Sequence, residues 1–219
     1  DPGCVLLEVD LSQAEWRIMA MLTRDDTLIK LAGTPPTEFD VHRYNASIVF
    51  SCSEQEVNKD MRYISKRAVH AADYGMHAKK LAEILLKDGH VKSPKECERI
   101  IETYMASMPA IRRWQHETAE QVRIHRCLAN GWGRMIHFAA DRITDDTYRE
   151  AYAWRPQSEC ADLLNHYGLL PLHDELVHYP GAAMNLQIHD SLYVSCLPEQ
   201  AFPIAEFLSH TLSRPRVYY

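Results

Sequence analysis

The sequence predicts an α+β fold, in which a small antiparallel sheet is backed by helices and the rest of the chain is mainly helical. Two observations predict the sheet: residues 4–11 form a short apolar run, and residues 186–196 alternate apolar and polar positions around a His–Asp pair. Helix signals fill most of the chain between them. With 219 residues, 46% of them hydrophobic and 25% charged, the chain has the composition of an ordinary globular protein.

The predicted elements follow in order from the amino terminus. Residues 4–11 fit a buried strand that delivers Asp10 at its end, and Ser12 is a possible N-cap for the helix that comes next. At Ser93 a serine N-cap precedes a proline and a capping-box glutamate, which marks a helix start. The further helices are predicted over residues 40–50, 54–74, 93–105, 109–128, 145–168 and 199–213.

Two β-hairpins are predicted in the second half of the chain. The NGWG turn at 130–133 lies between two short strand-like segments. In residues 186–196 the alternation places Asp190 at a hairpin turn. A similar His–Asp pair occurs in residues 172–180, but the flanking prolines leave little room for two paired strands, so Asp174 is predicted to lie in a loop or short edge strand. We therefore favour Asp190 as the carboxylate that a hairpin presents.

Charge and cysteine content limit the possible partners and compartments. The formal charge of −6 argues against a polyanionic partner unless basic residues cluster locally. No pair of the six cysteines has a CxxC or zinc-ligand spacing, so we expect reduced thiols in a cytosolic-type compartment. No apolar run approaches the ~18 residues that span a bilayer, and the segment DPGCVLLEVD at 1–10 has no basic flank of the kind that a signal peptide carries. We expect no membrane partner, and we expect the sequence to be a piece of a longer chain.

The most basic region lies on the helix predicted at residues 54–74. Arg62, Lys66, His70 and Tyr74 recur at i, i+4 spacing and therefore share one face. The two cations can form charge-assisted bonds with triphosphate oxygens, and the tyrosine ring can stack on a base. The alternative is a solvated surface face, which for two basic residues alone would be the better interpretation.

Asp10 and Asp190 are candidates for a pair of metal-binding carboxylates. In-line phosphoryl transfer commonly uses two divalent cations ~3.5–4 Å apart, which need carboxylates brought together from distant strands. Taken alone, an aspartate at a strand end is more often a helix cap or turn residue. Asp174 remains the competitor of Asp190 for the second position.

Three motifs resemble those of the family A DNA polymerases, the DNA polymerase I type. The segments DLSQAEWR at 10–17, RYISKRAVHAADYG at 62–75 and QIHDS at 187–191 resemble the first, second and third motifs of that family. The segment GWGR at 131–134 resembles its GRR turn. The motifs occur in the family's order and at family-like spacing over essentially the whole chain, which argues against a chance similarity.

The resemblance implies a polymerase palm in residues 1–40 and 141–219 and a mainly helical fingers subdomain in residues 41–140. It implies a catalytic core that adds dNTPs to a primer 3′ end on a DNA template by two-metal nucleotidyl transfer, with two Mg²⁺ that Mn²⁺ can replace. The implied partners are primer-template DNA, dNTPs and a second polypeptide segment with a thumb and an exonuclease-like domain. Residues 213–219 would end inside the last palm strand. The implied location is the cytoplasm of a bacterium or of a phage-infected host.

The resemblance also assigns roles to single positions. Asp10 and Asp190 would be the catalytic metal ligands, together with the main-chain carbonyl of Leu11. Glu15 would crowd the sugar 2′ position and so favour deoxynucleotides. The other implied contacts are those of His42, Arg62 and Lys66 with the triphosphate, His70 with the sugar, Tyr74 with the templating position, Arg149 and Gln157 with the DNA minor groove, and His189 with the primer terminus.

Three positions depart from the family pattern, and two alternatives stay open. His70 replaces an aromatic sugar contact, Ser191 replaces a glutamate and Trp16 replaces an aliphatic residue. We expect altered sugar discrimination from the first change. One alternative is a catalytically inactive nucleic-acid-binding subunit with a polymerase fold. The retention of Asp10, Asp190, Arg62 and Lys66 together argues against it. The other is a single-subunit RNA polymerase, which Glu15 disfavours.

Overall fold

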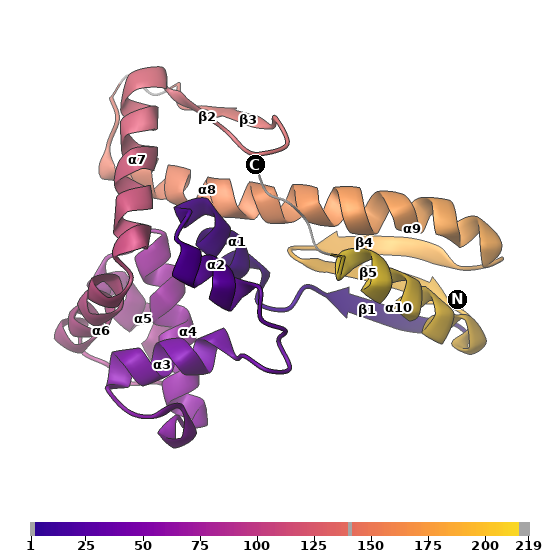
Figure 1. Cartoon of the computed structure of the whole chain (residues 1–219), viewed down its shortest axis with the longest axis horizontal. Helices are drawn as coiled ribbons and strands as arrows, with labels where there is room; N and C mark the ends of the chain where they lie inside the picture. The colour runs from indigo at the N-terminus through magenta and orange to yellow at the C-terminus, as the bar shows by residue number, and fades with distance from the viewer. Residues whose placement is uncertain (1–2, 140–141, 215–219) are drawn as a thin grey trace.

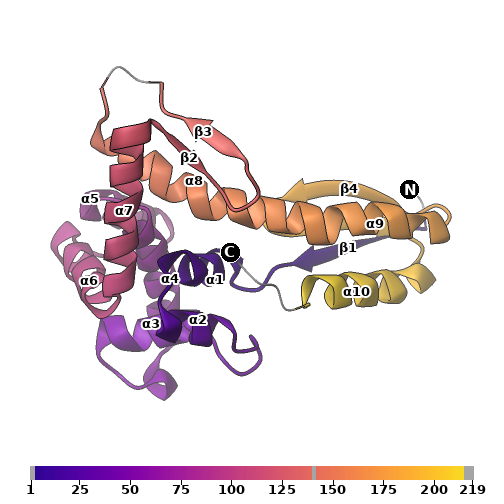
Figure 2. The ribbon, with the colours of Figure 1, turned by 45° about the horizontal axis from the view of Figure 1, so that its top comes forward.

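The computed structural model of the protein describes residues 3–139 and 142–214. A lobe of helices lies at one end of the molecule and a three-stranded sheet at the other (Figure 1). The long helix α8 (Asp145–Leu164) runs from the lobe along the sheet and links the two parts (Figures 1 and 2). The sequence prediction of an α+β protein is therefore confirmed.

The sheet brings the two ends of the sequence together. β1 and β5 pair in antiparallel register, with Asp10 opposite Ser191, although the two residues lie 181 positions apart. The predicted first strand and the predicted hairpin around Asp190 are both confirmed. The sheet has the order β1-β5-β4, with β1 at Val5–Asp10, β4 at Ala183–Ile188 and β5 at Ser191–Cys196.

β1 is less buried than the sequence predicts. It lies at an edge of the described sheet, where it pairs with β5 alone. Leu7 and Val9 face the core, where Leu172 of α9 (Leu170–Glu175) and Leu208 of α10 (Pro198–Leu212) cover the sheet. Leu6 is 64% exposed on the opposite face. One face of the described sheet and the edge formed by β1 therefore remain open.

The helices of the lobe occupy most of the first half of the chain. The predicted NGWG hairpin is also present, as β2 (Cys127–Ala129) paired with β3 (Met135–His137). The lobe helices are α1 (Ala14–Thr23), α2 (Asp26–Ala32), α3 (Val41–Phe50), α4 (Lys59–Asp73), α5 (Ala78–Lys87), α6 (Pro94–Ser107) and α7 (Pro109–His125).

Capping side chains mark the starts of α2, α3, α4 and α6. The predicted capping box joins Ser93 and Glu96, with the Ser93 N–H donating to the Glu96 carboxylate at 2.8 Å. A second capping box at Ser53 closes a separate 3₁₀ turn. As a result α4 begins after its Asn58 N-cap, and not at residue 54.

Two other predicted helix boundaries are wrong. Gln13, and not Ser12, occupies the N-cap of α1, in a left-handed conformation with φ 59° and without a side-chain cap. α7 ends at His125 and does not reach residue 128, because residues 127–129 form β2 and take their hydrogen bonds from β3.

The prediction that Asp174 lies in a loop or edge strand is also wrong. The residue lies on α9, which continues from α8 through a π-helical turn at Asn165–Leu169 and ends in a 3₁₀ turn at Leu176–His178. Pro171 follows directly on the π-helical turn, so the residue without an N–H lies at an existing irregularity of the helical hydrogen-bond ladder. Leu172 is fully buried beneath the sheet. Apolar burial, and not strand pairing, therefore fixes α9 against the sheet.

Two main apolar cores hold the described residues together. The larger core joins α1 and α2 to the helices α3, α4, α5, α6 and α7. The second lies between the sheet and the helices α9 and α10. None of the described helices is both long and apolar enough to cross a membrane. The last strand expected near residues 213–219 falls largely outside the described residues.

Candidate active site

A cavity of about 840 Å³ lies between the sheet end, the hairpin turn and the helices α1, α4 and α8. It gathers residues that are far apart in the sequence. Ten of the twelve predicted site residues line it: Asp10, Leu11, Glu15, His42, Lys66, His70, Tyr74, Gln157, His189 and Asp190. The other two, Arg62 and Arg149, lie outside its lining.

The sheet places the two carboxylates at the same end of neighbouring strands. Asp10 is the last residue of β1, and Asp190 lies in the two-residue turn between β4 and β5. The Leu11 N–H donates to the Asp190 carbonyl at 3.0 Å, which joins the end of β1 to that turn. His189, with φ 53°, provides the left-handed conformation that the turn requires.

Burial and like charge act together on Asp190. Burial raises the pKa of its carboxyl, and the charge of the neighbouring Asp10 raises it further. Two carboxylates in this position favour a cation between them. No group of three or more His, Cys, Asp or Glu that could hold a metal occurs in residues 3–139 and 142–214. Asp10 and Asp190 offer carboxylate oxygens, the ligand type of Mg²⁺, which is commonly held by one or two carboxylates together with substrate phosphates.

Ser191 contacts the first of these carboxylates. Its hydroxyl donates to Asp10 Oδ1 at 2.7 Å, and the residue is buried at the start of β5. A serine at this position thus removes one carboxylate from the site but adds a donor that orients Asp10. The register of β1 against β5 creates this contact, so no local sequence signal could have revealed it.

Lys66 projects from α4 into the cavity. Its side chain is exposed, and it forms no ion pair or hydrogen bond with any residue in the described part of the chain. Its charge lowers the pKa of both His42 and His70. A cation on the cavity wall without a protein partner is suited to an anionic ligand.

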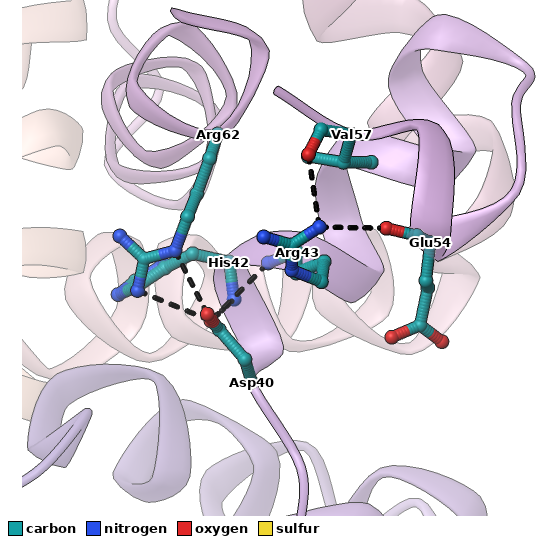
Figure 3. Close-up of polar contacts among 6 residues, drawn as sticks. All are labelled: Asp40, His42, Arg43, Glu54, Val57 and Arg62. Carbon is teal, nitrogen blue, oxygen red and sulfur yellow. Dashed lines mark hydrogen bonds and ion pairs between the residues drawn. The ribbon is translucent and has the colours of Figure 1, made fainter. Parts of the chain in front are cut away.

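Arg62, one turn earlier on α4, is held by Asp40 (Figure 3). Its Nε donates to Asp40 Oδ2 at 2.8 Å and its Nη2 to Oδ1 at 3.2 Å. Asp40 also caps α3 by accepting from the N–H groups of His42 and Arg43. Burial alone would raise the pKa of Asp40, but Arg62 and these donors outweigh it and lower the pKa. Arg62 therefore lies at the margin of the cavity, already paired.

His42 is a neutral imidazole beside two cations. Burial, followed by the charges of Lys66 and Arg62, lowers its pKa to about 4. Its Nδ1 is buried and has no hydrogen-bond partner among the described residues. A buried polar nitrogen without a partner is unfavourable, and the sequence reasoning gave no sign of it.

Glu15 contacts His70 of α4 and Tyr74, the residue that follows α4. Its Oε2 lies 3.1 Å from His70 Nδ1, and its carboxylate is hydrogen-bonded to Tyr74. Burial lowers the pKa of His70 despite the opposing effect of Glu15. Burial raises the pKa of the Tyr74 hydroxyl, and Glu15 raises it further. The sequence predicted all three residues but not their mutual contact.

α8 supplies the remaining two predicted residues. Gln157 lines the cavity and forms a hydrogen bond with Tyr74. Arg149 lies near the start of α8, where its guanidinium contacts His77 at 3.0 Å and Asp146 at 2.6 Å. Gln13 and Asp73 also line the cavity, and sequence reasoning gave neither of them a role.

The sheet, which carries two neighbouring carboxylates at its end, and the helical lobe beside it form the α+β fold of a polymerase domain. The family model "DNA polymerase family A" matches residues 1–217, and the chain belongs to this family. The structure is similar to the solved POL domain of Pol1 from M. smegmatis in complex with DNA primer-template and dNTP. The TM-score is 0.82 at 24% identity, over 98% of this chain and 38% of that one.

Curated relatives give the same assignment. The thermostable DNA polymerase I of Thermus aquaticus is 27% identical over 97% of this chain and 25% of its own length. The thermostable DNA polymerase I of Thermus thermophilus is 30% identical over 94% of this chain and 24% of its length. DNA polymerase I of Aquifex aeolicus is 27% identical over 97% of this chain and 36% of its length. The chain thus spans about a quarter to a third of these relatives.

Proposed function

We propose that this chain is the palm and fingers part of a template-directed DNA polymerase, which adds dNTPs to a primer 3′ end by two-metal nucleotidyl transfer. The observation that carries this proposal is the cavity that joins Asp10 and Asp190 to Lys66 and His70 of α4 and to Tyr74, which follows that helix. The palm comprises residues 1–40 and 141–219 and the fingers residues 41–140. Membership of the family and the match to a polymerase domain support this division.

The two carboxylates and the Leu11 carbonyl are proposed to hold two Mg²⁺, which Mn²⁺ can replace. Bound cations of this kind neutralise charge on the attacking and leaving oxygens of a phosphoryl transfer. The protein groups orient the reactants around them. The Ser191 hydroxyl keeps Asp10 in one orientation, and the hydrogen bond from Leu11 to Asp190 keeps the second carboxylate beside it.

The other residues are proposed to position substrates. Lys66 offers a cation and His42 a neutral imidazole to the triphosphate, and Arg62 can share its guanidinium between Asp40 and a phosphate. Glu15 and His70 form the wall that faces the sugar. Tyr74, Gln157, Arg149 and His189 are proposed to contact the templating base, the minor groove of primer-template DNA and the primer terminus.

Primer extension with dNTPs and with rNTPs tests this function against its alternatives. We expect extension with dNTPs and little with rNTPs, because the Glu15 carboxylate occupies the sugar side of the cavity. DNA binding without extension would support the inactive nucleic-acid-binding subunit instead. Preferential use of rNTPs would support an RNA polymerase.

A second polypeptide segment is the proposed partner, with a thumb and an exonuclease-like domain. A formal charge of −6 provides few cations for a duplex, whose binding depends largely on Lys and Arg. The open edge of β1 can pair with a further strand. We expect the isolated 219 residues to bind primer-template weakly, extend it negligibly and aggregate, and co-expression with the preceding segment to reverse all three. Salt-resistant extension by the isolated chain would contradict this partner.

The proposed location is a reducing, cytoplasmic-type compartment of a bacterium or a phage-infected host. All six cysteines are free thiols, at positions 4, 52, 97, 127, 160 and 196. Free thiols in this number are typical of proteins that remain in a reducing environment.

The role of His70 can be tested by its replacement with phenylalanine. We expect His70→Phe to support synthesis but to change the ratio of dideoxynucleotide to deoxynucleotide incorporation, because the ring facing the sugar changes and Glu15 loses its partner. The pKa of His70 is lowered by burial, so any effect of its protonation should appear on the acid side of its ordinary value of about 6.5. The same ratio in the wild type and in His70→Phe at every pH from 6 to 8 would contradict a sugar contact.

A further inference from the structure

Asp73 is a buried carboxyl in the cavity wall for which the proposed mechanism has no use. It is the last residue of α4, directly before Tyr74, and it is 4% exposed. It lines the same cavity as Glu15 and Tyr74. A carboxyl is seldom buried to this extent without a specific reason.

Three other helices hold the end of α4 on which Asp73 lies. The hydroxyl of Tyr104 on α6 donates to Asp73 Oδ1 at 3.1 Å, and Trp16 on α1 is hydrogen-bonded to the same hydroxyl. Gln115 on α7 donates its amide to the carbonyls of Ala72 and Asp73, at 2.8 and 2.9 Å. The last carbonyls of a helix lack partners within it, so these bonds fix the turn that leads to Tyr74.

The groups that face Asp73 make its ionised form unfavourable. Glu15 faces it from α1, Tyr104 from α6 and Tyr74 from the adjacent position, while α7 contributes the uncharged Gln115. Burial raises the pKa of Asp73 to about 8, the Tyr104 hydrogen bond opposes this rise, and the charge of Glu15 adds to it. At neutral pH the carboxyl is therefore mostly protonated, and at pH 9 it is an anion beside Glu15.

We propose that Asp73 is a proton-linked positioning residue of the nucleotide cavity, whose neutral form holds Tyr74 and Glu15 in place and whose ionised form displaces them. The proton leaves to solvent through the cavity. The negative charge that remains repels the Glu15 carboxylate and weakens its contacts with His70 and Tyr74. This inference rests on the proposed function, since Glu15 and Tyr74 act there as nucleotide contacts.

The test compares the wild type with Asp73→Asn in the active polymerase assembly, from pH 6.5 to 9.5. Asparagine keeps an acceptor for Tyr104 but cannot ionise. If only the neutral form binds well, the KM for the dNTP should rise about tenfold between pH 7 and 9 in the wild type, at unchanged kcat. In Asp73→Asn the KM should remain level. Tyr104→Phe is the matched control: it removes the bond that stabilises the anion, so the rise in KM should begin at higher pH.

Urea unfolding gives a second readout that requires no activity. The folded-state pKa of Asp73 is raised above its unfolded value, so its contribution to stability is present at low pH and is lost as the pH rises to about 8. We expect the wild-type urea midpoint to fall relative to that of Asp73→Asn as the pH rises from about 4, the unfolded pKa of an aspartate, to about 8. Equal pH dependence of the two unfolding midpoints would overturn the titration of Asp73.

The two readouts separate this inference from the proposed function. Extension with a KM that rises equally in the wild type and in Asp73→Asn would refute the role of Asp73 alone. Absence of extension in every variant would refute the proposed function and, with it, the role of Asp73 in nucleotide binding.

Discussion

Replacement of Asp10 or Asp190 by alanine is expected to abolish primer extension. One remaining carboxylate cannot hold two cations, and the loss of several kcal/mol of transition-state stabilisation corresponds to a decrease in turnover of about a thousandfold or more. The measurement is single-turnover extension by the active assembly, with DNA affinity measured in parallel. DNA affinity should change little, because neither carboxylate neutralises a phosphate.

Asp174→Ala is the matched control for this experiment. Asp174 follows a histidine as Asp190 does, but it lies exposed on α9 and outside the cavity lining. Its replacement should leave most of the activity intact. An inactive Asp174 variant together with an active Asp190 variant would show that the wrong carboxylate has been assigned. Asp190→Asn, which keeps the size of the side chain, separates the loss of charge from any loss of folding.

Lys66→Ala is expected to lower kcat/KM for the dNTP by roughly 10- to 150-fold. This is the effect of losing one charge-assisted phosphate contact, which costs roughly 1.5–3 kcal/mol. The expectation follows from the position of Lys66, which lines the cavity and forms no ion pair with any described residue. The measurement is the dNTP dependence of extension rates, with the DNA dissociation constant determined for the same variant.

Lys80→Ala is the matched control for Lys66. Lys80 lies on α5, outside the cavity lining, in an exposed pair with Glu83. Its replacement should alter dNTP use very little, because exposed pairs contribute little. If Lys66→Ala weakened DNA binding and left turnover unchanged, Lys66 would belong to a solvated or DNA-tracking face.

Local sequence patterns predicted those parts of the fold that local interactions determine. The Ser93 capping box, the hairpin with Asp190 at its turn and the amphipathic α4 all follow from neighbouring residues. Asp174 was misassigned because the flanking prolines were taken to leave room only for a loop or a short edge strand, whereas Pro171 lies within a helix, directly after its π-helical turn.

The contacts inside the site could not be predicted in this way. Ser191 contacts Asp10, which lies 181 positions away in the sequence. Glu15 on α1 pairs with His70 on α4. Such contacts depend on sheet register and helix packing, which no sequence spacing encodes. The resemblance to the polymerase family identified the residues but not these pairs. Asp73 went unnoticed, because a single carboxylate on a helix is ordinarily exposed.

The most direct test of the account is template-coded incorporation of a single nucleotide. Four primer-templates that differ only in the templating base are each offered the four dNTPs one at a time, with Mg²⁺ and with EDTA. The account predicts that the active assembly adds only the complementary dNTP, that EDTA stops the addition and that Asp190→Ala never performs it. Addition that ignores the templating base, or tight DNA binding by an intact assembly that adds no nucleotide, would contradict it.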